Sequence, residues 1–291
     1  MKTSTKILIA VCVIGLSLLL YPTVSNYWNE KHSTKAINTY IASMEHIDKE
    51  LYRETWEAAV EYNTRLAAEG GNSFVLPESL RDLYAKAINI SENGVMGYIE
   101  ISKIGVTLPV YHGTSESVLQ VAVGHIDWSS LPVGGESTHC VLSGHRGLPT
   151  AKLFTDLDKL REGDTFTLVI LGESLTYEVD QIRTVVPSDL SELGITEGRD
   201  YCTLVTCTPY GINTHRLLVR GHRVEGDESG LSKAVAEAVK VEPLFVAPVL
   251  AFPALFAGFL VIMLKKPKKK LTADDLLKYY HEKNESQHSA K

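Results

Sequence analysis

The sequence has no excess of positive charge, no internal repeat and no low-complexity tract. Lysine and arginine together number 29 against 35 aspartate and glutamate residues, so the formal net charge is −6. A chain with this balance lacks the basic surface that binds the phosphate backbone, and no nucleic-acid partner is expected. With 291 residues and no repeat, the chain is expected to hold one full domain plus additional segments.

Cysteine is scarce, with four residues in the whole chain. Cys12 lies in an apolar run near the N-terminus, which leaves Cys140, Cys202 and Cys207 in the rest of the chain. Three thiols cannot all be paired in intramolecular disulfides. In an exported protein the odd number indicates a free and reactive cysteine.

Two segments contain no charged residue, and these are expected to be membrane helices. The first runs from Ile7 to Tyr21 and stays uncharged until Glu30, and the second runs from Pro243 to Leu264. A spanning helix needs about 20 mainly apolar residues. Lysines flank the outer ends of both runs, which places both termini in the cytoplasm and residues 25–242 outside. The alternatives are a cleaved signal peptide for the first run and a buried core helix for the second.

The segment between the two runs changes from a helical to a β pattern. From Lys35 to Glu69 apolar residues recur at steps of three and four, which is typical of an amphipathic helix. From Gly97 onward the runs are short and rich in β-branched residues, and Gly172-Glu173-Ser174 predicts a hairpin within Thr165–Val179. At least seven such runs in about 130 residues predict a mainly β fold, a closed or nearly closed barrel.

Three chemically suited residues stand where predicted strands begin or end. His145 and Cys207 each follow an apolar run, and Arg216 opens the next one. A thiol attacks as thiolate, a histidine can pass the proton to a leaving amine, and an arginine can only donate hydrogen bonds. The pattern therefore predicts a nucleophile at Cys207, an acid–base at His145 and an oxyanion stabiliser at Arg216.

The same residues have other interpretations. Taken singly, Cys207 could be a small buried hydrophobe, His145 a structural histidine and Arg216 an ordinary surface ion-pair partner. A zinc site is a further alternative, with Cys140, His145, Cys202 and Cys207 as the four ligands. Against zinc, side chains alternate along a strand, so a spacing of five places the two residues of each pair on opposite faces.

Over longer stretches that include these residues, the sequence resembles the sortases, and among them the pilus-assembling class C. The resemblance rests on three stretches, "NGVMGYIEISKIGVTLPVYHGTSESVLQVAVGHIDWSSLPVGG" (93–135), "LSGHRGLPTAKLFTDLDKL" (142–160) and "TLVTCTPYGINTHRLLVRG" (203–221). It implies a closed β-barrel of about eight strands with short helices, preceded by an N-terminal helix and flanked by two transmembrane helices. It also implies His145, Cys207 and Arg216 as the catalytic residues, and Cys140 and Cys202 as reduced, buried neighbours on parallel strands.

The resemblance fixes the expected domain order. The expected boundaries are 1–28 for a membrane anchor or signal segment, 29–92 for a helical region with an atypical lid, 93–226 for the catalytic barrel, 227–242 for a linker, 243–264 for the C-terminal membrane helix and 265–291 for a cytoplasmic tail. The chain is thus expected in the cell membrane as a two-pass protein, in contact with lipid through two helices, with its catalytic domain extracellular.

The function implied is that of a cysteine transpeptidase without metal or cofactor. Cys207 would attack the threonine carbonyl of an LPxTG-like signal, and a pilin lysine would resolve the thioester, so that pilin subunits become joined by isopeptide bonds. The alternative is a housekeeping-type sortase that anchors surface proteins to peptidoglycan. A thiol hydrolase and a non-catalytic membrane scaffold are further alternatives. Analysis of the reaction products distinguishes these four functions.

One stretch departs from the class C pattern. These sortases usually carry an Asp-Pro-aromatic lid before the barrel, and "GGNSFVLPESLRDLY" (70–84) contains no such tripeptide. Leu76-Pro77-Glu78-Ser79 resembles the start of a sorting signal. Two interpretations follow: a proline turn between two helices, or a tethered pseudosubstrate that lies in the peptide groove.

Overall fold

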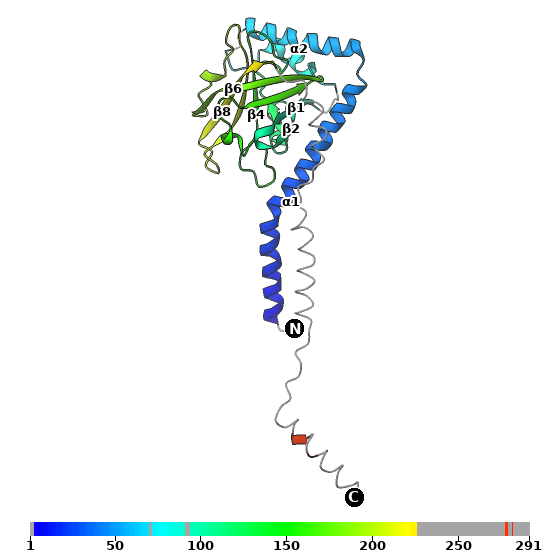
Figure 1. Ribbon diagram of the computed structural model, residues 1–291, viewed down its shortest axis with the longest axis vertical. Helices are drawn as coiled ribbons and strands as arrows, with labels where there is room; N and C mark the ends of the chain where they lie inside the picture. The colour runs from blue at the N-terminus through cyan, green and yellow to red at the C-terminus, as the bar shows by residue number, and fades with distance from the viewer. Residues whose placement is uncertain (1–2, 70–71, 91–93, 226–276, 279–280, 282–291) are drawn as a thin grey trace. The chain divides into compact units, whose positions relative to one another are not determined.

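The computed structural model describes residues 3–69, 72–90, 94–225, 277–278 and 281 (Figure 1). The predicted membrane segment 243–264, the linker and nearly all of the tail lie outside the described residues. Within the described part, one helix is long and apolar enough to cross a membrane, in the stretch Val11–Glu45. A signal sequence near the N-terminus has a similar length and composition.

The N-terminal region consists of two long helices and two short ones. These are α1 (Thr3–Glu45), α2 (Lys49–Glu69), the 3₁₀ helix η1 (Glu78–Leu80) and α3 (Arg81–Lys86). The continuous helical pattern expected from Lys35 to Glu69 is therefore divided. The division falls at Asp48, whose carboxylate oxygen accepts a hydrogen bond of 2.8 Å from the backbone amide of Glu50. An aspartate in this position starts a new helix, because it satisfies an amide that the first turn leaves unpaired.

Eight strands form a closed barrel in the order β1-β2-β3-β4-β7-β8-β6-β5. Their bounds are β1 Val95–Ile101, β2 Val106–His112, β3 Val123–His125, β4 Thr138–Ser143, β5 Thr165–Ile170, β6 Glu173–Val185, β7 Asp200–Thr208 and β8 His215–Val224. Two neighbouring pairs, β2 with β3 and β4 with β7, are parallel, and the others are antiparallel. The predicted eight-stranded barrel is confirmed. Short helices occupy the connections: α4 (Glu116–Leu119) and the 3₁₀ helices η2 (Ser102–Ile104), η3 (Leu157–Lys159) and η4 (Ser191–Leu193).

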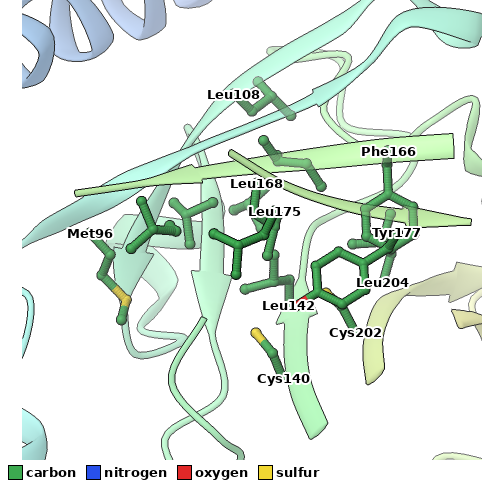
Figure 2. Packing of buried hydrophobic residues seen from close by; sticks show 14 of the residues in the cluster. Met96, Leu108, Cys140, Leu142, Phe166, Leu168, Leu175, Tyr177, Cys202 and Leu204 are labelled. Carbon is green, nitrogen blue, oxygen red and sulfur yellow. The ribbon is translucent and has the colours of Figure 1, made fainter. Parts of the chain in front are cut away.

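Apolar side chains from all eight strands pack the barrel interior (Figure 2). The short strand β3 contributes one of them, Val123. Phe166 and Tyr177 stack there with ring centroids 5.6 Å apart. Gly221 lies beneath them, and a β-carbon at this position would come within 2.9 Å of both aromatic residues. A glycine is therefore required where β8 passes the stacked rings.

The hairpin between β5 and β6 turns one residue earlier than the sequence suggests. Leu171 and Gly172 form the turn with φ values of +53° and +82°, as a two-residue hairpin connection of the primed type requires. A leucine is unusual in this backbone region. Its amide donates a 2.6 Å hydrogen bond to the Tyr40 hydroxyl of α1, so the turn and the helix hold each other in place.

Helix α2 is fastened to the barrel by a buried asparagine. The Asn63 side-chain amide donates to the carbonyl oxygen of Leu131 at 3.0 Å, and its oxygen accepts from the amide of Leu131 at 2.7 Å. Only 4% of Asn63 is exposed. Both main-chain polar groups of a buried loop residue are thus satisfied by one side chain.

Replacing Asn63 by alanine is expected to lower the free energy of unfolding by about 2–4 kcal/mol, because two buried main-chain groups lose their partners. Chemical denaturation measures the loss. The control is Thr64→Ala on the exposed side of the same helix, for which a change within about 0.5 kcal/mol is expected. Equal losses in the two variants would contradict this role of Asn63.

Candidate active site

Strands β4, β7 and β8 lie side by side and present two different faces. Leu204 and Val219 are directly opposite each other and point into the main core, whereas their neighbours Val205 and Leu218 belong to a separate apolar cluster outside it. We call the second one the outer face. Because side chains alternate along a strand, Cys207 shares the outer face with Val205, and Arg216 shares it with Leu218.

Cys207 and Arg216 are direct partners in the antiparallel ladder between β7 and β8. Both side chains are partly buried. The Arg216 guanidinium donates through Nη1 to the carbonyl oxygens of His215 at 3.1 Å and of Asn213 at 3.4 Å. Asn213 has a φ of +61° in the turn that joins the two strands. The turn therefore directs its carbonyl towards the arginine and anchors the guanidinium at the start of β8, on the strand residue paired with Cys207.

His145 reaches the same place through the parallel pairing of β4 with β7. The last ladder partners are Ser143 and Val205, and the pairing continues one residue further. The amide of Gly144 donates to the carbonyl oxygen of Val205 at 3.0 Å, and the Thr206 hydroxyl donates to the carbonyl oxygen of Gly144 at 2.7 Å. The residues that follow Gly144 and Thr206 in the sequence are His145 and Cys207. The structure thus brings together all three predicted site residues at one end of the outer face.

Arg146 joins the segments that carry His145 and Cys207. Its guanidinium donates to the Thr208 hydroxyl at 3.1 Å and to the carbonyl oxygen of Thr155 at 3.2 Å, and it forms an ion pair with Asp158. Only 8% of the Arg146 side chain is exposed. Arg146 follows His145 and Thr208 follows Cys207, so this contact joins the residues directly after the two candidate catalytic groups.

Replacing Arg146 by alanine is expected to lower kcat/KM about tenfold to a hundredfold, because small displacements of reacting groups are costly. The telling readout is the rate of Cys207 alkylation by a series of reagents at one fixed pH, which should change when His145 is no longer held in place. Asp158→Asn keeps the guanidinium and should show a much smaller effect. A variant that only lost stability, with an unchanged alkylation profile, would refute a positioning role.

An apolar wall covers the outer face next to the three residues. The cluster contains Val141, Val205, Leu218 and Leu193, and partly buried residues packed against it include Phe74 and Trp128. The rings of Phe74 and Trp128 meet edge to face with centroids 5.2 Å apart. Phe74 comes from the N-terminal region, and so a residue outside the barrel lies on the face that carries the candidate nucleophile.

Known proteins are similar to this chain in sequence and in fold. The sortase domain family matches residues 99–224. The structure of sortase C1 from Streptococcus agalactiae is similar with 52% sequence identity and a TM-score of 0.63, covering 66% of this chain and 100% of that one. The chain belongs to the sortase family, in class C.

Two further relatives extend the comparison. A structure of Clostridium perfringens sortase C with the C-terminal cell wall sorting motif shows 45% identity and a TM-score of 0.59, over 66% of this chain and 100% of that one. Sortase D of Bacillus subtilis is 32% identical over 131 residues, 44% of this chain. The chain spans 63% of the length of that curated relative. Sortases are cysteine transpeptidases, and this sortase is therefore an enzyme of that type.

Two other thiols of this sortase lie inside the barrel. Cys140 and Cys202 are partners in the parallel ladder, are 2% and 0% exposed, and are both free (Figure 2). The expected pairing of reduced, buried neighbours is confirmed. Burial raises the pKa of Cys202 well above its usual value, so this thiol stays protonated and unreactive.

The zinc alternative finds no support in this geometry. Cys140 and Cys202 point into the core, whereas Cys207 lies on the outer face. In the described part of the chain, no group of three or more histidine, cysteine, aspartate or glutamate side chains is placed to hold a metal ion.

The Leu76-Pro77-Glu78-Ser79 stretch is a turn between helices. Leu76 is 9% exposed and packs in the main core with residues of α2, and Pro77 precedes η1. The Ser79 hydroxyl donates to the Glu69 carboxylate at 2.5 Å. The pseudosubstrate interpretation is therefore wrong for these four residues, because their side chains are used to join α2 to α3. It is Phe74, two residues earlier, that reaches the outer face.

Two hydrogen bonds of His139 hold the connection between β6 and β7 against the outer face. Its Nδ1 donates to the carbonyl oxygen of Gly194 at 2.8 Å, and its Nε2 accepts from the Thr203 hydroxyl at 2.7 Å. Burial lowers the pKa of His139 to about 4, which keeps the ring neutral in this tautomer at physiological pH. Neither this contact nor those of Arg146 and Phe74 could be found from spacing, because each joins residues far apart in the sequence.

Proposed function

We propose that this sortase cleaves LPxTG-like sorting signals at Cys207 and joins pilin subunits through lysine isopeptide bonds. The observation that carries the proposal is the placement of Cys207 directly opposite Arg216, with His145 at the matching position beside them, on one face. The similarity to class C sortases supports pilin over peptidoglycan as the acceptor.

In the proposed first half-reaction, the Cys207 thiol gives its proton to His145, and the sulfur attacks the threonine carbonyl carbon as thiolate and forms a tetrahedral intermediate. Arg216 donates hydrogen bonds to the oxyanion, since it is fixed beside the thiol and stays protonated. As the carbon–nitrogen bond of the Thr-Gly peptide breaks, His145 gives a proton to the leaving amine. A thioester between Cys207 and threonine remains.

In the second half-reaction, the amine of a pilin lysine attacks the thioester carbonyl. His145 takes a proton from that amine, the carbon–sulfur bond breaks, and Cys207 leaves as thiolate. The product is an isopeptide bond, and no oxidant or reductant is consumed. An extended sorting signal suits the end of a strand face beside an apolar cluster, here that of Val205 and Leu218.

The test of the reaction is product analysis with the full chain in detergent. Incubation with a pilin that carries an LPxTG-like signal and an acceptor lysine should give a covalent ladder on a denaturing gel. Transfer only to a peptidoglycan-type amine would indicate the housekeeping function. Release of free acid alone would indicate a hydrolase, and the absence of any product would refute the transpeptidase proposal.

We further infer a two-pass membrane topology with the catalytic barrel outside the cell. The apolar start of α1 supports the first span, and the uncharged run 243–264 followed by lysines supports the second. Accessibility of single cysteines placed in the tail and in the barrel, measured on intact cells, tests this topology. Labelling of the tail from outside would contradict it.

We also infer that the segment around Phe74 is the lid of this sortase. Phe74 has a φ of +53°, a conformation that costs a non-glycine residue roughly 1–2 kcal/mol. Its packing on Trp128 and the outer-face cluster compensates for that strain. An aromatic residue held by packing and not by the Asp-Pro pair can leave the face when a sorting signal competes for it.

Replacing Phe74 by alanine is expected to speed alkylation of Cys207 severalfold and to raise the rate of signal-peptide hydrolysis, because the outer face becomes more open. Val75→Ala is the matched control, since 64% of the Val75 side chain is already exposed. Unchanged labelling kinetics in Phe74→Ala would remove the lid and leave an enzyme with a permanently open site.

A further inference from the structure

A groove lies between helix α1 and the barrel where the helix first meets the domain. It has a volume of about 460 Å³ and is bounded by Trp28, His32 and Lys35 of α1 and by Tyr111 and Val121 of the barrel side. This volume is in the range of sites for small molecules. None of the three candidate catalytic residues lines it.

The groove lies at the level of the lipid headgroups if α1 spans the membrane as proposed. The uncharged part of the helix ends at Asn29, directly after Trp28, and Lys35 follows six residues later, a rise of roughly 9 Å along the helix axis that a lysine side chain can span back towards the headgroups. The headgroup layer on each side of a bilayer is about 5–8 Å deep. Tyr21, Tyr27 and Trp28 are 53%, 49% and 64% exposed, and exposed tyrosine and tryptophan mark the membrane interface.

The polar groups in the groove suit an anion. Lys35 is exposed and forms no ion pair with any described carboxylate. His32 donates from Nδ1 to the carbonyl oxygen of Trp28 at 2.8 Å, so the other ring nitrogen, Nε2, takes no part in this bond. The nearby acid Glu30 accepts a hydrogen bond from the Asn26 amide at 2.7 Å. The groove thus combines one uncompensated cation with an imidazole and an aromatic wall.

Hydrogen bonds between α1 and the barrel hold the two walls of the groove together. The Asn29 side-chain amide donates to the carbonyl oxygen of Val121 at 3.2 Å, and the Asn26 side-chain oxygen accepts from the amide of Lys152 at 2.7 Å. Further along the helix, Ile37 and Tyr40 pack on Val95 and Tyr98 of β1. The groove is therefore formed before any ligand binds, and little ordering is needed on binding.

We propose that this groove binds the phosphate-bearing headgroup of an anionic phospholipid from the surrounding membrane. Lys35 pairs with the phosphate, Trp28 and Val121 contact the glycerol and the first acyl carbons, and the barrel is held against the bilayer surface. The inference rests on the proposed membrane anchoring and not on the proposed reaction. It adds a lipid site to a domain whose known chemistry needs none.

Native mass spectrometry of the full chain in detergent tests the proposal. The probes are a short-chain phosphatidylglycerol, phosphatidylcholine with the same acyl chains, and inorganic phosphate alone. One phosphatidylglycerol should be retained per chain, and Lys35→Gln should lower its apparent affinity about fivefold or more. Lys31→Gln is the control, because Lys31 has the same charge and lies one helical turn closer to the apolar part of α1 but does not line the groove.

Three outcomes would overturn the lipid site: equal retention of phosphatidylcholine, an equal loss in the Lys31 variant, or complete displacement by inorganic phosphate at low millimolar concentration. The last would make the ligand a free phosphate. Pilin polymerisation by Lys35→Gln in detergent should match the unmodified chain. Failure of the lipid test with normal polymerisation would refute this site alone, whereas loss of polymerisation in the unmodified chain would refute the proposed function.

Discussion

Cys207→Ala is expected to form no acyl-enzyme with a sorting-signal peptide, and pilin polymerisation should fall to background. The other described thiols cannot substitute, because Cys140 and Cys202 are buried in the barrel interior and Cys12 lies in the apolar part of α1. Intact-protein mass spectrometry in the presence of peptide measures the thioester directly as an added mass.

The matched control is Cys202→Ala on the same strand and the opposite face. This variant removes a buried side chain and should lose stability, by about 1–2 kcal/mol for a residue of this size. It should still form the thioester at the temperature where it is folded. A thioester in Cys207→Ala, or its absence from folded Cys202→Ala, would contradict the assignment of the nucleophile.

Arg216→Lys should lower the rate of acyl-enzyme formation by about 10²–10³ while the protein stays folded. Lysine keeps the charge but offers no planar pair of donors. The guanidinium uses Nη1 on the main-chain oxygens of His215 and Asn213. This anchoring orients the remaining N–H groups of the Arg216 guanidinium. The single ammonium nitrogen of a lysine cannot donate both to these main-chain oxygens and to the oxyanion.

Single-turnover kinetics with excess enzyme isolate this step from lysine attack. Arg183→Lys is the control, since Arg183 is the exposed partner of Leu218 on the neighbouring strand β6 and carries the same charge near the same face. A decrease of similar size in both variants would mean that general electrostatics, and not the position opposite Cys207, determines the rate.

The sequence predicted the barrel because its strands carry their signal locally. Runs such as Tyr201–Cys207 and Arg216–Val224 are β-branched and bounded by turn residues, and both became long strands. The three-residue strand Val123–His125 was not predicted. It is too short to show a period, and only its pairing with β2 and β4 defines it.

The candidate catalytic residues could be predicted for the same reason as the strands, because their signal is local in the sequence. His145, Cys207 and Arg216 belong to long motifs, and each lies at a strand end where chain order alone makes it conspicuous. The residues that support or cover this site gave no such signal. Arg146 bonds to Thr208 across 62 residues of sequence, and Phe74 meets Trp128 only after the helical region folds against the barrel. Contacts of this kind follow from tertiary packing, which no local pattern encodes.

The parallel register of β4 and β7 has a consequence for which length changes the chain tolerates. Cys140 lies opposite Cys202 and Ser143 opposite Val205, and each strand then continues to its own functional residue. Inserting one residue between Cys202 and Cys207 would reverse the alternation and turn the nucleophile into the barrel interior. The same insertion among the exposed residues 210–212, before the Asn213 carbonyl that anchors Arg216, lengthens a surface turn and leaves both faces unchanged. Natural variation in length should therefore be confined to the loops, and the five-residue spacings inside these strands should behave as fixed distances.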